Sequence, residues 1–192
     1  MTVAILYGAG SGALHAVTGP DHVLSLGPVA LERPKASFRI GLMWGVGHAL
    51  GTLLLSLPVL LLSHLVHLPT LASWGDSLAG AALLLAAAWS WHSQRKAAHG
   101  GADTRQPLVV GLIHGISGAG SLLLVLPVLV AGSLEHTLLF LSAFAVGSTV
   151  AMAALTTLIA RLGGHLEQRV LERARKLMTI AAAALGCYWL LG

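Results

Sequence analysis

Four histidines and one aspartate stand inside long apolar stretches, where ionisable side chains are rare. Asp21 is flanked by His15 and His22 in the first stretch, while His48 and His114 lie in the second and fourth. A charge at the middle of a bilayer costs about 2.5–3.5 kcal/mol on insertion scales, so this carboxylate needs a partner. Neutral imidazole binds Ni, Co, Zn, Cu and Fe. The pattern predicts that the five side chains bind a divalent transition-metal ion, and a proton relay through the same groups is the alternative.

Helix-breaking residues interrupt the first and fourth apolar stretches at matching places. They are Gly19-Pro20 in the first stretch and Gly118-Ala119-Gly120 in the fourth. Proline removes a backbone donor and clashes with the preceding turn. Backbone groups freed inside a membrane must line a cavity or bind a ligand. We therefore expect Gly19, Pro20, Gly118 and Gly120 to form the backbone of the ion site, although a kink or close packing through small residues gives the same pattern.

The composition is that of a membrane protein. Of the 192 residues, 56% are hydrophobic and only 9% are charged, whereas soluble domains have about 25% charged residues. A bilayer core needs about 20 apolar residues per helix. By this measure we predict one all-α transmembrane domain over residues 1–192, with its helices at about 3–31, 37–66, 74–92, 107–132, 134–160 and 174–191.

All 11 lysines and arginines fall in three connections, at 33–39, 95–105 and 161–176. With six spans these connections lie on one side, which the positive-inside rule makes cytoplasmic, with both termini outside. The predicted location is therefore a bacterial cytoplasmic membrane. The basic charge reflects topology, and no nucleic-acid partner is predicted. The other side carries anionic and imidazole side chains that we expect to attract cations at an outer entrance, or else to be merely solvated: His64, His67, Asp76, Glu135 and His136.

An internal repeat relates the two halves of the chain. A shift of 99 positions aligns 12–19 with 111–118 and Pro28-Val29 with Pro127-Val128; a shift of 100 aligns 81–89 with 181–189. Because three spans are an odd number, the second copy enters the membrane from the opposite face. We therefore expect two inverted three-helix repeats, at about 1–93 and 107–192, joined by a cytoplasmic linker at about 94–106. Chance similarity between Gly- and Ala-rich helices is the alternative.

Two motifs resemble the nickel/cobalt transporter (NicO) superfamily. His15-Ala-Val-Thr-Gly-Pro-Asp21-His22 is similar to its His-x4-Asp-His signature, with one more residue between His and Asp, and 41–48 is similar to its second-span Gly-His motif. Residues 111–121 resemble the shorter, urease-accessory-type bacterial members, and the acidic motif of the nickel permeases has no counterpart. The resemblance implies an alternating-access carrier of Ni²⁺ or Co²⁺, with no resident cofactor and no enzymatic activity, and it assigns metal binding to His15, Asp21, His22 and His48.

Two other functions compete with the carrier. Gly115-Ile-Ser117-Gly118 is similar to the Gly-x-Ser-Gly of rhomboid proteases, but 174–191 contains no His, Asp or Glu to act as the base. A metal-delivery or accessory subunit for a metalloenzyme is the other candidate. Expected partners are the ion, the lipid bilayer, and either further copies of the chain or accessory subunits. The single cysteine, Cys187, excludes an intramolecular disulfide and a thiolate cluster.

Overall fold

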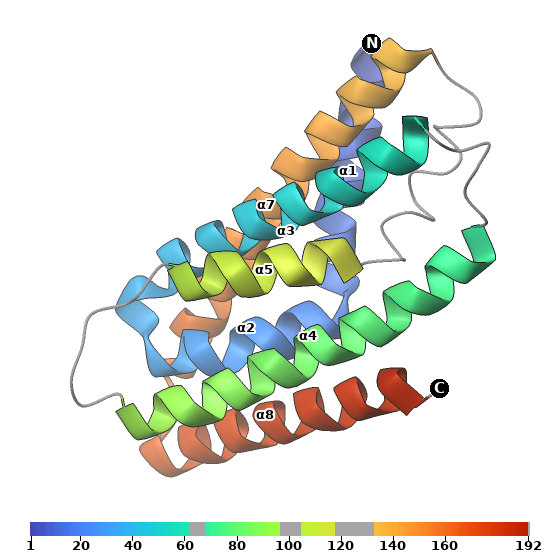
Figure 1. Cartoon of the computed structure of the whole chain (residues 1–192). Helices are drawn as coiled ribbons and strands as arrows, with labels where there is room; N and C mark the ends of the chain where they lie inside the picture. Colours follow the sequence, from blue (N-terminus) through green and yellow to red (C-terminus); the bar gives the residue numbers. More distant parts are fainter. Residues whose placement is uncertain (62–67, 97–104, 118–132, 192) are drawn as a thin grey trace.

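The computed structural model describes residues 1–61, 68–96, 105–117 and 133–191, and every regular element within these ranges is a helix (Figure 1). The predicted all-α class is therefore confirmed. The helices are α1 (Thr2–Thr18), α2 (Pro20–Glu32), α3 (Ser37–Leu61), α4 (Leu68–Lys96), α5 (Arg105–Ser117), α7 (Leu134–Gly163) and α8 (Gln168–Leu191), with one 3-10 turn, η1 (Pro34–Ala36).

The first apolar stretch is broken at Gly19-Pro20, as predicted. Gly19 takes an extended conformation (φ −70°, ψ 111°) between α1 and α2, and its N–H donates to the carbonyl of His15 at 3.1 Å. Pro20 opens α2, where the N–H that it lacks would have no helical partner. Asp21 follows in the first turn, where a carboxylate complements the positive end of the helix dipole. Gly118 and Gly120, the predicted second break, lie outside the described residues.

The helices pack in pairs that join distant parts of the chain. α1 packs against α7, α3 packs against α5, and α4 and α8 lie side by side along one edge of the molecule (Figure 1). A central apolar cluster joins α1, α2, α3 and α7. Its buried members are Ala16, Leu26, Val29, Ile40, Trp44 and Met152.

Glycines allow backbones to meet in the α1–α7 and α3–α5 pairs, and they do so at corresponding positions. A Cβ at Gly12 would collide with the carbonyl of Phe144, and a Cβ at Gly111 would collide with the carbonyl of Trp44. Shifts of 99 and 100 residues interconvert these two contacts. The same shifts interconvert two further contacts, of Gly47 with Leu108 and of Gly147 with Ala9. Each of these glycines therefore marks a close helix crossing that any side chain would push apart.

The predicted arrangement of six membrane spans as an inverted repeat is not supported. Among the described residues, two helical segments are long and apolar enough to cross a bilayer: Pro34–Leu57, of mean hydropathy 1.6, and Leu134–Gly163, of mean hydropathy 2.1. The first apolar stretch does not form one membrane-spanning helix. Its break leaves helices of 17 and 13 residues, which are shorter than the roughly 20 residues that a span needs. α8 begins in a charged segment, 168–176. Apolar windows therefore overcounted the spans.

Candidate metal centre

The histidines and the aspartate singled out from the sequence come together, four of them from the ends of helices and His48 from the middle of α3. His15 lies in the last turn of α1, and Asp21 and His22 lie in the first turn of α2. His48 comes from α3 and His114 from the last turn of α5. The Gly19-Pro20 break allows this meeting, because it turns the chain between the two helices that carry His15 and His22. The break and the α3–α5 contact thus gather residues that are up to 99 positions apart.

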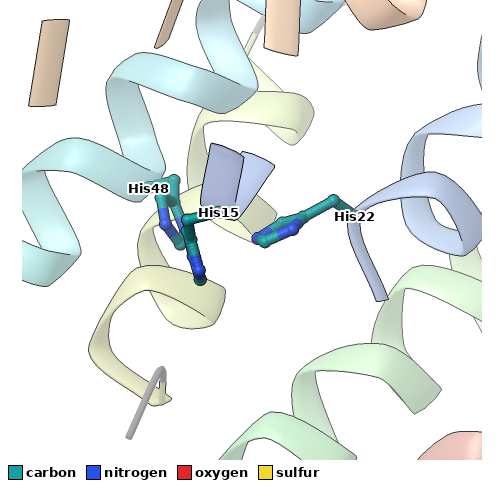
Figure 2. Close-up of side chains that lie close together, drawn as sticks. All are labelled: His15, His22 and His48. Carbon is teal, nitrogen blue, oxygen red and sulfur yellow. The ribbon is translucent and has the colours of Figure 1, made fainter. Parts of the chain in front are cut away.

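The imidazoles of His15, His22 and His48, here called the His triad, point toward one another from three helices (Figure 2). The ring centroids of His15 and His22 are 4.8 Å apart, those of His22 and His48 are 5.3 Å apart, and those of His15 and His48 are 5.5 Å apart. One nitrogen from each ring can be chosen so that all three lie within 4.8 Å of one another. This spacing suits three ligands around one ion after small side-chain adjustments.

Five of the six ring nitrogens of the His triad are buried without hydrogen bonds among the described residues. His22 and His48 are 0% and 1% exposed, and His15 is half-buried. Among the described residues, both ring nitrogens of His22, both of His48, and Nε2 of His15 have no hydrogen-bond partner. Leaving a buried polar group unsatisfied costs about 1–3 kcal/mol. Five such nitrogens in one place indicate a site whose polar partner is a ligand.

Asp21 and His114 form a tight pair beside the triad. His114 Nε2–H donates to Asp21 Oδ2 at 2.6 Å, while the other carboxylate oxygen lies 3.7 Å from His22 Nδ1. Asp21, His22 and His114 form a second group of potential ligands, which shares His22 with the triad. The carboxylate is thus placed to hold His114 in one orientation and to offset the charge of an ion bound next to His22.

Two aromatic residues that the sequence did not single out as site residues complete the wall of the site. Trp44 stacks on His48 with an interplanar angle of 7° and also lies against His22 and His114, with ring centroids 5.2–5.4 Å apart. Phe144 lies 5.7 Å from His15. The four-residue spacing of Trp44 and His48 puts both side chains on one face of α3. This spacing was the sequence signal that could have identified Trp44 as a site residue. These rings keep water away from one side of the triad.

Glycines bring the backbone close to the site. A Cβ at Gly115 would collide with the carbonyl of His48, so α5 approaches α3 closely at the level of the triad. A Cβ at Gly19 would collide with His22 Nδ1 and would lie 2.8 Å from Asp21 Oδ1. The room for the His22 ring therefore depends on the absence of a side chain at Gly19. Pro20, the other residue of the described break, is exposed.

The residues of the predicted outer entrance do not join this cluster among the described residues. Glu135 and His136 are exposed in the first turn of α7, where Ser133 caps the helix and its hydroxyl lies 2.7 Å from His136 Nδ1. The N-terminal amine lies 3.4 Å from His136 Nε2. Asp76 belongs to α4, but its side chain is outside the described part. His64 and His67 also lie outside the described residues, so the entrance stays a prediction.

Two curated proteins of Arabidopsis thaliana are similar to this chain. Chloroplast protein FOR GROWTH AND FERTILITY 2 is 28% identical over 185 residues, covering 87% of this chain and 50% of that protein. Chloroplast protein FOR GROWTH AND FERTILITY 1 is 28% identical over 196 residues, covering 90% of this chain and 53% of that protein. The chain thus spans about half the length of these relatives. No family model matches the chain, and no solved structure matches it.

These comparisons correct the family, function and location predicted from the sequence. The relatives are plant chloroplast proteins, so the resemblance to nickel/cobalt transporters is wrong, and so is the location in a bacterial cytoplasmic membrane. The comparisons give no support to a nickel or cobalt carrier, to an accessory subunit or to a protease. Ser117, the serine of the protease-like motif, donates its hydroxyl hydrogen to the carbonyl of His114 at 2.8 Å. The transporter resemblance rested on three short stretches, 15–22, 41–48 and 111–121.

Proposed function

We propose that this protein binds one divalent transition-metal ion through the His triad, with the Asp21–His114 pair beside it. The observation that carries the proposal is the set of five buried ring nitrogens without hydrogen-bond partners among the described residues. Hydrogen-bonded packing histidines would have their nitrogens satisfied by carbonyls or hydroxyls. Rings gathered from three helices without such partners are instead arranged for a ligand that accepts their lone pairs.

The donor set defines the class of ion. Imidazole nitrogen suits Zn²⁺, Cu²⁺, Ni²⁺, Co²⁺ and Fe²⁺, whereas Mg²⁺ and Ca²⁺ prefer sets of oxygen ligands. Thiolate supplies no ligand, because Cys187 is the single cysteine of the chain and is exposed on α8. Three imidazoles leave a position for water, for Asp21 or for a further ligand. The protein's role is therefore proposed as selective binding of such an ion at a buried site.

We also propose that the lipid bilayer surrounds part of the chain. Large apolar side chains cover the outer faces of α1, α7 and α8, among them Leu6, Tyr7, Val146, Leu177 and Tyr188, each more than 60% exposed. Soluble monomers rarely expose contiguous apolar patches larger than a few hundred Å². Lipid contact accounts for this surface together with the low charge content. That the whole chain forms one membrane domain stays a prediction.

The halves of the chain are proposed to be two copies of one helical unit. The reciprocal contacts of Gly12 with Phe144 and of Gly111 with Trp44 support this relation. In this relation His15 of the first copy corresponds to His114 of the second. Two statements stay predictions from the sequence. One is that the chain is not an enzyme, and the other is that it works as a homo-oligomer or with accessory subunits.

Metal content of the purified protein tests the binding proposal. The chain is purified in detergent, dialysed against Zn²⁺ and analysed for bound zinc per chain. We expect about one ion in the wild type and in His165→Ala, a control that removes an exposed histidine, and almost none in His22→Ala or His48→Ala. Zinc that is absent from the wild type, or retained equally by all variants, would refute the assignment.

A further inference from the structure

One face of α3 carries a row of polar side chains that starts at the metal centre. His48, Thr52 and Ser56 are spaced by four residues, so they lie above one another on the helix. Thr52 is 4% exposed and Ser56 is 0% exposed. Among the described residues, neither hydroxyl has a hydrogen-bond partner. The row therefore extends the unsatisfied polar surface of the His triad along the helix toward its end at Leu61.

Two other buried hydroxyls among the described residues, those of Thr156 and Thr179, do not behave in this way. Thr156 donates to the carbonyl of Met152 at 2.6 Å, and Thr179 donates to the carbonyl of Arg175 at 2.9 Å. This return bond to the preceding turn is the usual solution for Ser and Thr inside helices. Thr52 and Ser56 forgo it, so their hydroxyls are left for a partner outside their own helix.

The spacing of the row suits water. Successive residues of the row are one helical turn apart, a rise of about 5.4 Å to 6 Å, and one water molecule bridges such a gap with two hydrogen bonds of roughly 2.8 Å. An unsatisfied buried hydroxyl costs about 1–3 kcal/mol, and buried water makes about three hydrogen bonds to groups of this kind. From His48 to Ser56 the row covers eight residues, or about 12 Å along the helix axis.

We infer that His48, Thr52 and Ser56 line a hydrated path by which a divalent cation reaches the His triad from the Leu61 end of α3. The cation as its occupant rests on the proposed metal site. Along this path the hydroxyl oxygens replace part of the ion's hydration shell, and the imidazole of His48 is the first nitrogen ligand that the ion meets. Trp44, one turn further along the same face, closes the path beyond the triad.

Cysteine accessibility tests the path. In a Cys187→Ser background, Thr52→Cys and Ser56→Cys are treated with 2-aminoethyl methanethiosulfonate, a small cation that reacts with thiolates in water. The matched control is Thr156→Cys, at a fully buried position whose hydroxyl bonds to its own helix. We expect the two row variants to react at least tenfold faster than the control, and Zn²⁺ to slow the reaction at position 52. Row variants as unreactive as the control would overturn the path.

The zinc arm separates the path from the metal site. Fast modification that Zn²⁺ does not slow would overturn the use of the path by the cation. Fast modification in a chain whose wild type binds no zinc would overturn the metal site while leaving the hydrated row intact.

A kinetic measurement gives a second, independent test. Thr52→Val combined with Ser56→Ala removes the hydroxyls without touching the triad. We expect the association and dissociation rates of Zn²⁺ to fall together by at least tenfold, with an unchanged dissociation constant, whereas Thr156→Val leaves both rates at wild-type values. Unchanged rates in the double variant, or a changed dissociation constant with unchanged association, would overturn the inference.

Discussion

Replacing Gly19 by alanine should damage the metal centre without removing any of its ligands. The added Cβ would collide with His22 Nδ1 and would lie 2.8 Å from Asp21 Oδ1. Ordinary van der Waals contact between such atoms requires about 3.5–4.0 Å, so the His22 ring must retreat by roughly 1.5 Å. The backbone at Gly19 (φ −70°, ψ 111°) is open to any residue. The substitution therefore tests space at the site rather than backbone strain.

The displacement is large compared with what a metal site tolerates. Metal–ligand distances hold to within about 0.2 Å in a well-formed site, and disturbing the support of one ligand typically weakens binding about 10–100-fold. We expect Gly19→Ala to raise the Zn²⁺ dissociation constant by that factor, or about 1.4–2.8 kcal/mol. The protein should otherwise keep its helix content, because Gly19 lies between α1 and α2 rather than within either helix.

A competition titration of Zn²⁺ against a chromophoric chelator measures this effect. Gly10→Ala is the matched control, because a Cβ there would meet no described atom within 4 Å. It should bind Zn²⁺ like the wild type and gain up to about 1 kcal/mol of helix stability. Wild-type affinity in Gly19→Ala, or an equal loss in both variants, would refute the geometry assigned to His22.

Three further predictions concern the charges and lone pairs of the site. His48→Leu should leave the metal-free protein at least as stable as the wild type, because an apolar side chain of similar size replaces an unsatisfied buried ring. Thermal melts of this variant should also show no stabilisation by Zn²⁺, whereas the wild type should gain about 2.7 kcal/mol at a Zn²⁺ concentration of 100 times Kd. A metal-free variant that melts well below the wild type would contradict this. Asp21→Asn keeps the shape but removes the charge and should weaken Zn²⁺ binding about 10–100-fold in the same titration, and unchanged affinity would remove the carboxylate from the site. Binding needs neutral imidazoles, and burial lowers the pKa of His22 to about 3 from the free value of about 6.5. Affinity should therefore stay nearly constant from pH 7.5 down to pH 5.5 and fall only in more acid solution, where protons compete; an affinity that already falls steeply between pH 7.5 and 5.5 would contradict a buried, neutral His22 as ligand.

Much of the site could be predicted from the sequence, because several of its residues lie close together along the chain. The break at Gly19-Pro20 follows from proline chemistry, and it brings His15 and His22 together through a few residues of chain. His114 is distant in sequence, and its position in the fourth apolar stretch was the signal for including it; the structure brings its Nε2 to 2.6 Å from Asp21 Oδ2. Whether these residues bind metal stays a prediction.

Other features depended on information that apolar windows and short motifs do not contain. The number of spans was wrong because a window of apolar residues does not register that Gly19-Pro20 divides it into two short helices. Trp44, Thr52 and Ser56 share the face of His48, which four-residue spacing indicates but does not single out among the many apolar positions of α3. The family was wrong because it was inferred from three short stretches, whereas the similarity to the two chloroplast proteins extends over 87% and 90% of the chain.

X-ray absorption spectroscopy of the zinc-loaded protein tests the central claim most directly. The account predicts about one zinc per chain with at least three nitrogen ligands at about 2.0–2.1 Å, showing the multiple-scattering pattern of imidazole, and loss of this spectrum in a variant carrying His15→Ala, His22→Ala and His48→Ala together. A spectrum dominated by oxygen ligands, or one that persists in the triple variant, would show that the His triad does not hold the ion.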